Sequence, residues 1–194
     1  PLKPTNPYGN SKLAIETLLN DIYQSSTQNW SIINLRYFNP IGAHYSGLIG
    51  ECPSGFASNI FPLILKVAYG DLPLLKIFGN NWNTKDGTCV RDYIHIMDLV
   101  EGHLSALEFL FSNKGTMFNL NLGTGKGNSV LDLVNSFQKV NKVKIAYQFT
   151  DKRQGDVESV VANNELAKSL LDWNPKKNIF DMCRDGWKWK TNNP

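Results

Sequence analysis

Short apolar runs alternate with longer amphipathic stretches along this chain, and that alternation restricts the possible fold more than any other feature. Runs rich in β-branched residues predict buried strands, at 30–40, 74–79, 89–96, 117–122 and 144–149. Apolar residues at helical spacing predict helices, which begin at Pro7 and then cover 60–69, 98–112, 129–140, 163–171 and 179–190. Strands that alternate with helices predict an α/β architecture with a parallel sheet component.

Three local signals refine these elements. Asn6 is predicted to cap the first helix because Pro7, which lacks an N–H, suits the first helical position. Asp98 is predicted to cap the helix that ends near residue 112. The stretch 41–59 is rich in Gly, Ser, Asn and Pro, so we expect a long ordered loop, and such loops within compact domains are usually functional.

Tyr8 and Lys12 lie four residues apart at the start of the first helix, so they share one face. A lysine cation and the positive end of a helix both favour the ionised form of a nearby phenol. A tyrosine placed in this way can take a proton from an alcohol and return it. Taken alone, the pattern more often marks a surface lysine beside a half-buried tyrosine, so the choice depends on the rest of the chain.

Composition excludes several classes of partner. The 20 basic and 17 acidic residues are spread along the sequence without a basic run, so we expect no nucleic-acid surface. We also expect no membrane span, because no apolar stretch approaches the roughly 20 residues that a bilayer requires. The 3 cysteines and 3 histidines show no ligand spacing, which favours a reducing compartment, the cytoplasm, and no metal. The chain does not begin with Met and a helix starts at once, so we expect a fragment.

The segment NLGTGKGNS superficially matches a dinucleotide-binding turn that joins a strand to a helix. That fingerprint requires G-x-G-x-x-G, and Asn128 stands where the third glycine belongs. The acidic residue expected about 20 positions further on is also missing, since Asp151 is the nearest candidate. We therefore predict a structural turn in which Asn128 or Ser129 caps the next helix, with cofactor phosphates bound elsewhere.

Five segments in order resemble those of the UDP-glucose/UDP-galactose 4-epimerases, which belong to the extended short-chain dehydrogenase/reductase superfamily. They are YGNSK at 8–12, RYFNPIGAH at 36–44, DGTCVRDYIHIMDLVEGH at 86–103, NLGTGKGNSV at 121–130 and RQGD at 153–156. YxxxK marks only the superfamily, whereas the second and third segments are much more specific. The resemblance covers nearly the whole chain and corresponds to the carboxy-terminal part of such an enzyme.

The resemblance implies an incomplete NAD(P)-binding Rossmann-like fold with a smaller α/β substrate-binding domain. Residues 1–44 would be the remainder of the Rossmann domain and 45–194 the substrate-binding domain, with 91–125 packing back on the Rossmann sheet. The glycine-rich NAD loop and the catalytic serine or threonine would lie upstream of Tyr8. A homodimer is expected for the full-length protein.

The resemblance also implies a mechanism in which NAD oxidises C4 of a UDP-hexose to a ketone. Tyr8 would exchange the hydroxyl proton, and Lys12 would tune Tyr8 and hold the nicotinamide ribose. Phe38 matches the position whose backbone meets the nicotinamide. The ketose would turn over in the site before hydride and proton return to the opposite face.

The positions that match the family's UDP-sugar contacts follow from the same resemblance. They are Asn39, Asn59, Ile60, Lys76, Ile77, Phe78, Arg91, Arg153, Asp156 and Val160. The two arginines suit a diphosphate because guanidinium groups bind phosphate in bidentate fashion. Val160 stands where relatives vary between Tyr and smaller residues, which predicts room for N-acetylated sugars.

Alternatives to this interpretation remain within and outside the class. A nucleotide-sugar 4,6-dehydratase or decarboxylase shares YxxxK but usually carries a YGP-type turn where this chain has FNPIGAH. A third possibility is that the chain as it stands is an inactive substrate-binding fragment. Without the resemblance, Arg91-Asp92 would be a surface pair, RQGD a solvated turn and Phe78 a core residue.

Overall fold

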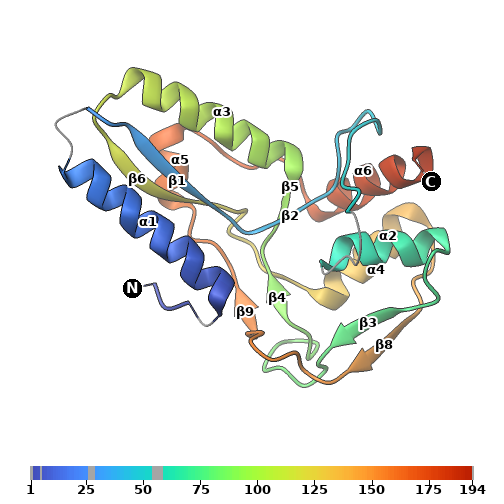
Figure 1. Ribbon diagram of the computed structural model, residues 1–194. Helices are drawn as coiled ribbons and strands as arrows, with labels where there is room; N and C mark the ends of the chain where they lie inside the picture. Colours follow the sequence, from blue (N-terminus) through green and yellow to red (C-terminus); the bar gives the residue numbers. More distant parts are fainter. Residues whose placement is uncertain (1, 5, 26–28, 54–58, 194) are drawn as a thin grey trace.

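The computed structural model describes residues 2–4, 6–25, 29–53 and 59–193 and has the expected α/β architecture (Figure 1). Its helices are α1 (Pro7–Ser25), α2 (Ile60–Tyr69), α3 (Ile96–Ser112), α4 (Val130–Asn141), α5 (Glu165–Leu171) and α6 (Ile179–Asn192). Its strands are β1 (Ile32–Tyr37), β2 (Asn39–Ile41), β3 (Leu75–Phe78), β4 (Val90–Arg91), β5 (Tyr93–His95), β6 (Met117–Leu122), β7 (Asn128–Ser129), β8 (Tyr147–Thr150) and β9 (Ser159–Val160). The predicted loop at 41–59 lies partly outside these residues, since 54–58 are not described.

Most strand pairs are parallel, as the sequence predicts. β1 pairs with β6, β2 with β5 and β3 with β8, each in parallel register. The short strand β4 pairs in parallel with β9 and antiparallel with β7. The strand predicted over 30–40 is divided at Phe38, because its partner changes there from β6 to β5. Among the described residues, no helix combines the length and apolarity needed to cross a membrane.

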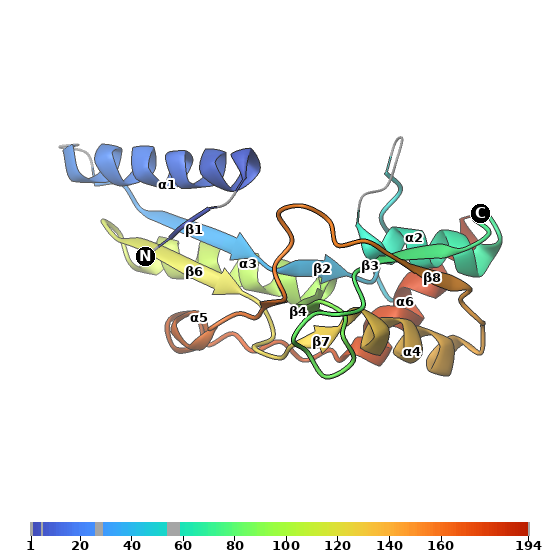
Figure 2. The same cartoon turned by 90° about the horizontal axis from the view of Figure 1, so that it is seen from below.

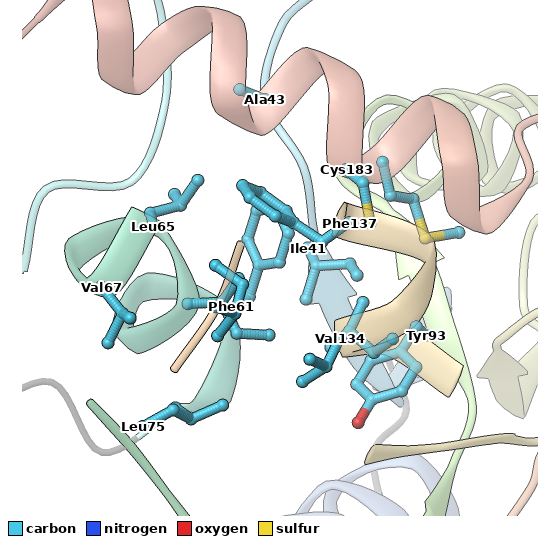
Figure 3. Packing of buried hydrophobic residues seen from close by; sticks show 14 of the residues in the cluster. Ile41, Ala43, Phe61, Leu65, Val67, Leu75, Tyr93, Val134, Phe137 and Cys183 are labelled. Carbon is cyan, nitrogen blue, oxygen red and sulfur yellow. The ribbon is translucent and has the colours of Figure 1, made fainter. Parts of the chain in front are cut away.

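Strand β5 separates two hydrophobic clusters. Tyr93, 2% exposed, packs in the first cluster with residues of α2, β3, α4 and α6 (Figure 3). The next residue, Ile94, is 0% exposed and packs in the second cluster, with residues of α3, β6 and α5. Successive side chains of a strand point to opposite faces, so β5 forms a wall that both clusters share.

Helix α1 lies on the outer side of β1 and buries none of its residues in the described structure (Figure 2). The Asn6 side chain accepts a hydrogen bond from the Gly9 N–H at 2.8 Å, which confirms the predicted cap. Two polar contacts attach the helix to the sheet. Glu16 accepts two hydrogen bonds from Arg36 of β1, at 2.7 and 2.5 Å, and the Tyr23 hydroxyl donates to a backbone carbonyl at 2.8 Å.

Two further caps can be compared with the sequence predictions. Ser129 caps α4, and its hydroxyl and the Asp132 carboxylate form a reciprocal capping box, as one of the two predicted alternatives requires. The prediction that Asp98 caps α3 is wrong, because the helix begins earlier and His95 accepts from the Met97 N–H. The Asp98 carboxylate instead accepts a hydrogen bond from the Lys177 N–H at 2.9 Å.

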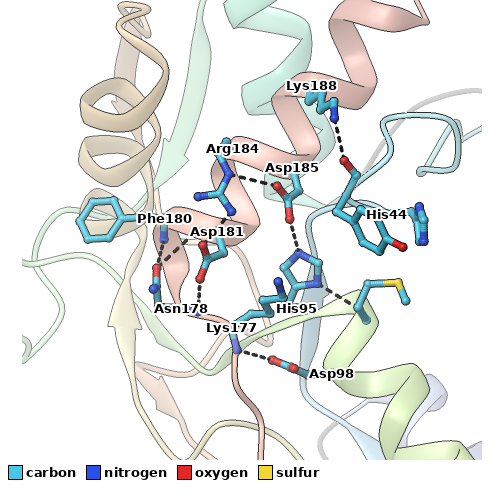
Figure 4. Close-up of polar contacts among 12 residues, drawn as sticks. His44, His95, Asp98, Lys177, Asn178, Phe180, Asp181, Arg184, Asp185 and Lys188 are labelled. Atoms are coloured by element: carbon cyan, nitrogen blue, oxygen red, sulfur yellow. Dashed lines mark hydrogen bonds and ion pairs between the residues drawn. The ribbon is translucent and has the colours of Figure 1, made fainter.

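His95 also connects β5 to α6 (Figure 4). Its Nε2 lies 3.2 Å from Oδ2 of Asp185, and both residues are buried. Because Nδ1 accepts from a backbone N–H, the proton of the neutral ring is on Nε2 and is donated to the carboxylate. Burial lowers the pKa of His95, and this effect outweighs the opposite influence of Asp185.

The lowered pKa of His95 predicts a loss of stability on mild acidification. In the unfolded chain a histidine binds a proton near pH 6.5, whereas folded His95 resists protonation to lower pH. The free energy of unfolding should therefore fall as the pH drops below about 6.5, by at most about 1.4 kcal/mol per pH unit from this group. Urea denaturation of wild type and His95→Gln across this range measures the effect. An unchanged pH slope in His95→Gln would contradict the prediction.

Candidate active site

Two cavities adjoin each other in the described structure. The larger, about 840 Å³, lies between α1, the β1–β2 junction and the start of α2. The smaller, about 210 Å³, lies between α2, β3, β4 and the segment that precedes β9. Four residues line both cavities, namely Asn39, Asn59, Ile60 and Tyr93. A ligand could therefore extend from one cavity into the other.

Tyr8 and Lys12 line the larger cavity from the first turns of α1. The Lys12 ammonium lies over the Tyr8 ring, 5.1 Å from its centroid, so the contact is made with the aromatic face. Tyr8 is 73% exposed, and its hydroxyl group is therefore accessible to a ligand. The pair is adjacent as the helical spacing predicts, and its position can serve proton transfer to and from a bound alcohol.

Phe38 and Asn39 occupy the junction of β1 and β2. The Phe38 N–H donates to the Leu122 carbonyl of β6 at 3.2 Å, and the Asn39 N–H donates to the Asp92 carbonyl at 2.9 Å. The two residues thus form the step at which the strand changes its partner. This step places Phe38 in the larger cavity and Asn39 on the wall that both cavities share.

Asn59 and Ile60 mark the start of α2. Asn59 occupies the N-cap position, yet its side chain makes no capping hydrogen bond. The amide group of Asn59 is therefore not committed to the helix, and the residue is exposed on the shared wall. The N-terminus of α2 directs its positive end toward the same wall, which favours a negatively charged ligand.

Strand β3 forms one side of the smaller cavity, where Lys76, Ile77 and Phe78 contribute to the lining. Ile77 is 1% exposed and packs in the first cluster, so the strand is fixed against the core. The guanidinium carbon of Arg153 lies 4.4 Å from the centroid of the Phe78 ring. This stacking holds a cation above the β3 side of the cavity.

Arg91 and Arg153 approach the smaller cavity from different segments, and Asp156 lies between them. The Asp156 carboxylate is 4.0 Å from Nη2 of Arg91 and 3.7 Å from Nε of Arg153. Nη1 of Arg91 also donates to the carbonyls of Val90 and Val157, both at 2.8 Å. Two guanidinium groups so close together suit a diphosphate, whose charge they can share.

Val160 is the one predicted site residue that lines neither cavity in the described structure. It pairs with Arg91 across the β4–β9 ladder and is 37% exposed. All the other predicted site residues line one or both cavities. The structure therefore brings the other predicted site residues together around the two cavities, whereas Val160 lies outside both.

Several residues that sequence reasoning did not select also line the cavities, and three of them carry titratable groups whose pKa burial raises. Tyr93 lies on the shared wall, and it follows Arg91 at the two-residue spacing that places side chains on one face of an extended chain. Cys89 is buried in the smaller cavity and Glu51 lines the larger one. Burial raises the pKa of each of these three groups. The two-residue spacing from Arg91 could have identified both Cys89 and Tyr93, whereas no local signal marks Glu51.

Comparison with known proteins shows strong similarity over the whole chain. It is 50% identical over 194 residues to UDP-glucose 4-epimerase 4 of Oryza sativa subsp. japonica, covering 100% of this chain and 52% of that protein. The crystal structure of UDP-glucose 4-epimerase from Bifidobacterium longum in complex with NAD+ and UDP matches with a TM-score of 0.94 and 41% identity. That match covers 100% of this chain and 57% of that one.

A second crystal structure matches equally well in shape. It is a UDP-glucose 4-epimerase from Stenotrophomonas maltophila with bound NAD and formylated UDP-arabinopyranose, with a TM-score of 0.94 and 44% identity over 98% of this chain and 56% of that one. The fold is therefore that of part of a Rossmann-like extended short-chain dehydrogenase/reductase. The chain spans about half the length of the curated relatives it matches.

The family model described as GDP-mannose 4,6 dehydratase matches residues 1–186. This match extends from α1 into α6 and includes every residue that lines the two cavities. On the strength of that match, the chain belongs to the GDP-mannose 4,6-dehydratase family.

Proposed function

We propose that the complete protein interconverts UDP-glucose and UDP-galactose through a transient 4-keto sugar, with NAD as a retained cofactor. The observation that carries this proposal is the pair of connected cavities. One contains a tyrosine and a lysine suited to proton transfer, and the other contains two arginines suited to a diphosphate. The similarity to UDP-glucose 4-epimerases along the whole chain supports the same reaction.

In this proposal Tyr8 is the general base and acid. Acting as the phenolate, its accessible oxygen takes the proton of the sugar 4-hydroxyl, and the phenol so formed later returns the proton to the oxygen at the inverted centre. Lys12 lies against the Tyr8 ring, so it brings a positive charge beside the phenol where the proton is transferred. Both side chains come from one rigid helix, so their spacing does not depend on a loop.

The residues of the larger cavity fit an NAD nicotinamide only in part. Tyr8, Lys12 and Phe38 would border the nicotinamide and its ribose. When bound, NAD supplies a hydride acceptor and donor at C4 of the sugar. The turn at 123–127 offers no site for the NAD phosphates, because its amide groups bind Asp92. We therefore place the phosphate site outside this chain and expect the chain alone to be inactive.

The smaller cavity is proposed to hold the UDP group. Arg91 and Arg153 bind the diphosphate, and Asp156 accepts from the uridine ribose. The backbone of Lys76, Ile77 and Phe78 faces the uracil. Asn39, Asn59 and Ile60 lie between the two cavities and contact the diphosphate and the sugar.

Further elements of the proposal concern size, assembly and location. The acceptance of sugars with an N-acetyl group at C2, which Val160 predicts, stays a prediction, because Val160 lines neither cavity. Residues 1–44 belong to the Rossmann domain and 45–194 to the substrate-binding domain, with 91–125 packed back on the sheet.

The apolar residues that α1 exposes, Ile15, Leu18 and Ile22, support a homodimer. Three free cysteines support a reducing location, the cytoplasm.

The reaction itself can be tested with the complete protein and UDP-galactose. We expect UDP-glucose to form with no net production of NADH, because the hydride returns to the sugar in each turnover. Chromatography of the sugar nucleotides and NADH absorbance measure both quantities. Formation of a 4-keto-6-deoxy sugar would instead favour a 4,6-dehydratase, and loss of carbon dioxide from UDP-glucuronic acid would favour a decarboxylase.

Tyr8→Phe tests the proposed base. The substitution keeps the ring and its contact with Lys12 but removes the hydroxyl. The turnover number should fall by about 10²–10⁴-fold, the usual contribution of a general acid–base group, while UDP affinity stays close to that of wild type. Steady-state rates and calorimetric titration with UDP provide the measurements. Wild-type turnover in this variant would remove Tyr8 from the mechanism.

Arg153→Ala tests the diphosphate site, and the adjacent Lys152→Ala is its matched control. Arg153 faces the smaller cavity, whereas the Lys152 ammonium lies 4.2 Å from the centre of the Trp82 ring and does not line the cavity. Arg153→Ala should weaken UDP binding by about 1.5–3 kcal/mol, the scale of a charged hydrogen bond. Lys152→Ala removes the same charge with little effect. Equal losses in the two variants would indicate a general effect of charge rather than direct contact.

A further inference from the structure

The carboxylate of Asp92 is fully buried and accepts four hydrogen bonds from two distant segments. Oδ1 accepts from the Thr124 N–H at 2.9 Å and from the Thr124 hydroxyl at 2.5 Å. Oδ2 accepts from the Gly125 N–H at 2.8 Å and from the Ala162 N–H at 3.2 Å. Asp92 is 0% exposed, so no ligand can reach it and its charge is satisfied entirely by the protein.

The glycine turn that follows β6 is shaped around this carboxylate. Gly125 adopts φ = +75°, a left-handed conformation that glycine tolerates best. A Cβ atom on Gly123 would lie 2.7 Å from Oδ2 of Asp92 and 2.6 Å from the Ala162 side chain. The Asn164 side chain donates to the Gly123 carbonyl at 2.7 Å and closes the turn from the other side. The glycines therefore let the backbone approach Asp92 closely.

The backbone of Asp92 connects three segments that carry predicted site residues. Its N–H donates to the Val160 carbonyl at 3.0 Å, and its carbonyl accepts from the Asn39 N–H at 2.9 Å. Arg91 precedes it directly in the chain. The side chain extends this connection, because Ala162 lies just beyond Val160 and is bound by Oδ2. One residue thus fixes Asn39, Arg91 and the end of β9 relative to one another.

From this arrangement we propose that Asp92 is a positioning residue for UDP-sugar binding. It touches neither cavity, and it acts by holding the strand of Arg91 against the segment that contains Asp156 and Val160. The inference rests on the proposed function only for the identity of the ligand. The structural tie itself exists without nucleotide and can be measured without it.

Asp92→Asn in the complete protein is the sharpest test. The Asn oxygen can still accept from Thr124, but its NH₂ group would face the N–H groups of Gly125 and Ala162, which are also donors. The amides of Gly125 and Ala162 should exchange hydrogen at least about tenfold faster in the nucleotide-free protein. UDP affinity should fall about tenfold, the scale of one charged hydrogen bond, with a rise in KM and a much smaller change in kcat.

Asp98→Asn is the matched control, because it makes the same substitution at another buried carboxylate. Asp98 is 2% exposed and accepts from the Lys177 N–H at 2.9 Å, away from both cavities. This variant should lower the denaturation midpoint and leave UDP affinity and KM unchanged. The proposal is overturned if Asp92→Asn binds UDP like wild type, or if Asp98→Asn weakens UDP binding to the same extent.

Thr124→Val provides a milder variant in case Asp92→Asn does not fold. It removes the hydroxyl, which donates to Oδ1 and also accepts from the Lys126 N–H at 3.1 Å, and it keeps the backbone N–H groups that bind Asp92. We expect UDP affinity to fall about threefold, less than for Asp92→Asn, because Oδ1 keeps its hydrogen bond from the Thr124 N–H. Wild-type UDP affinity in the folded variant would overturn the proposal. If wild type itself does not bind UDP, the proposed function fails, while faster exchange at Gly125 and Ala162 in Asp92→Asn would still support the tie.

Discussion

The parallel pairing of β2 with β5 is the constraint on which the rest of the molecule depends. A parallel pair cannot be closed by a tight turn, so the chain between the two strands must leave the sheet and return. In this protein that excursion contains α2, β3 and β4, which form part of the lining of the smaller cavity. The same pairing places Tyr93 and Ile94 in different hydrophobic clusters. The site thus lies beside β5, the strand that both hydrophobic clusters contact.

The charge arrangement of the smaller cavity follows from this architecture. Arg91 and Arg153 come from segments far apart in sequence, and the Asp156 carboxylate lies between them. A bound diphosphate would replace this carboxylate as the partner of both cations, and the carboxylate would then be available to a sugar hydroxyl.

Sequence patterns predicted the elements whose signals are local. The bounds of α2 and the Asn6 cap agree with the structure because they depend on residues within one or two turns. The predicted cap of α3 was wrong because the helix begins at Ile96 with His95 as its cap, and the Asp98 carboxylate accepts instead from the Lys177 N–H, remote in sequence. The division of the strand at Phe38 was missed for a similar reason, since it reflects a change of partner.

The candidate site shows the same limit. Family motifs gave the residues that line the cavities, and the structure brought all but Val160 together. Motifs did not reveal Asp92, which sequence alone would place on the surface beside Arg91, because its partners Thr124 and Ala162 are distant in the chain. Long-range polar contacts of this kind leave no periodic trace in a sequence.

The glycine turn that holds Asp92 shows how one backbone shape can serve two purposes. Turns of this kind, between a strand and a helix, present N–H groups that elsewhere bind the phosphate of a nucleotide. Here the anion is supplied by the chain itself, as a built-in substitute for a bound phosphate. The N–H groups of this turn are bound by the Asp92 carboxylate as soon as the protein folds. They are therefore not available to bind a phosphate group from solution. The glycines of this turn therefore serve to bind a carboxylate of the chain itself rather than a cofactor.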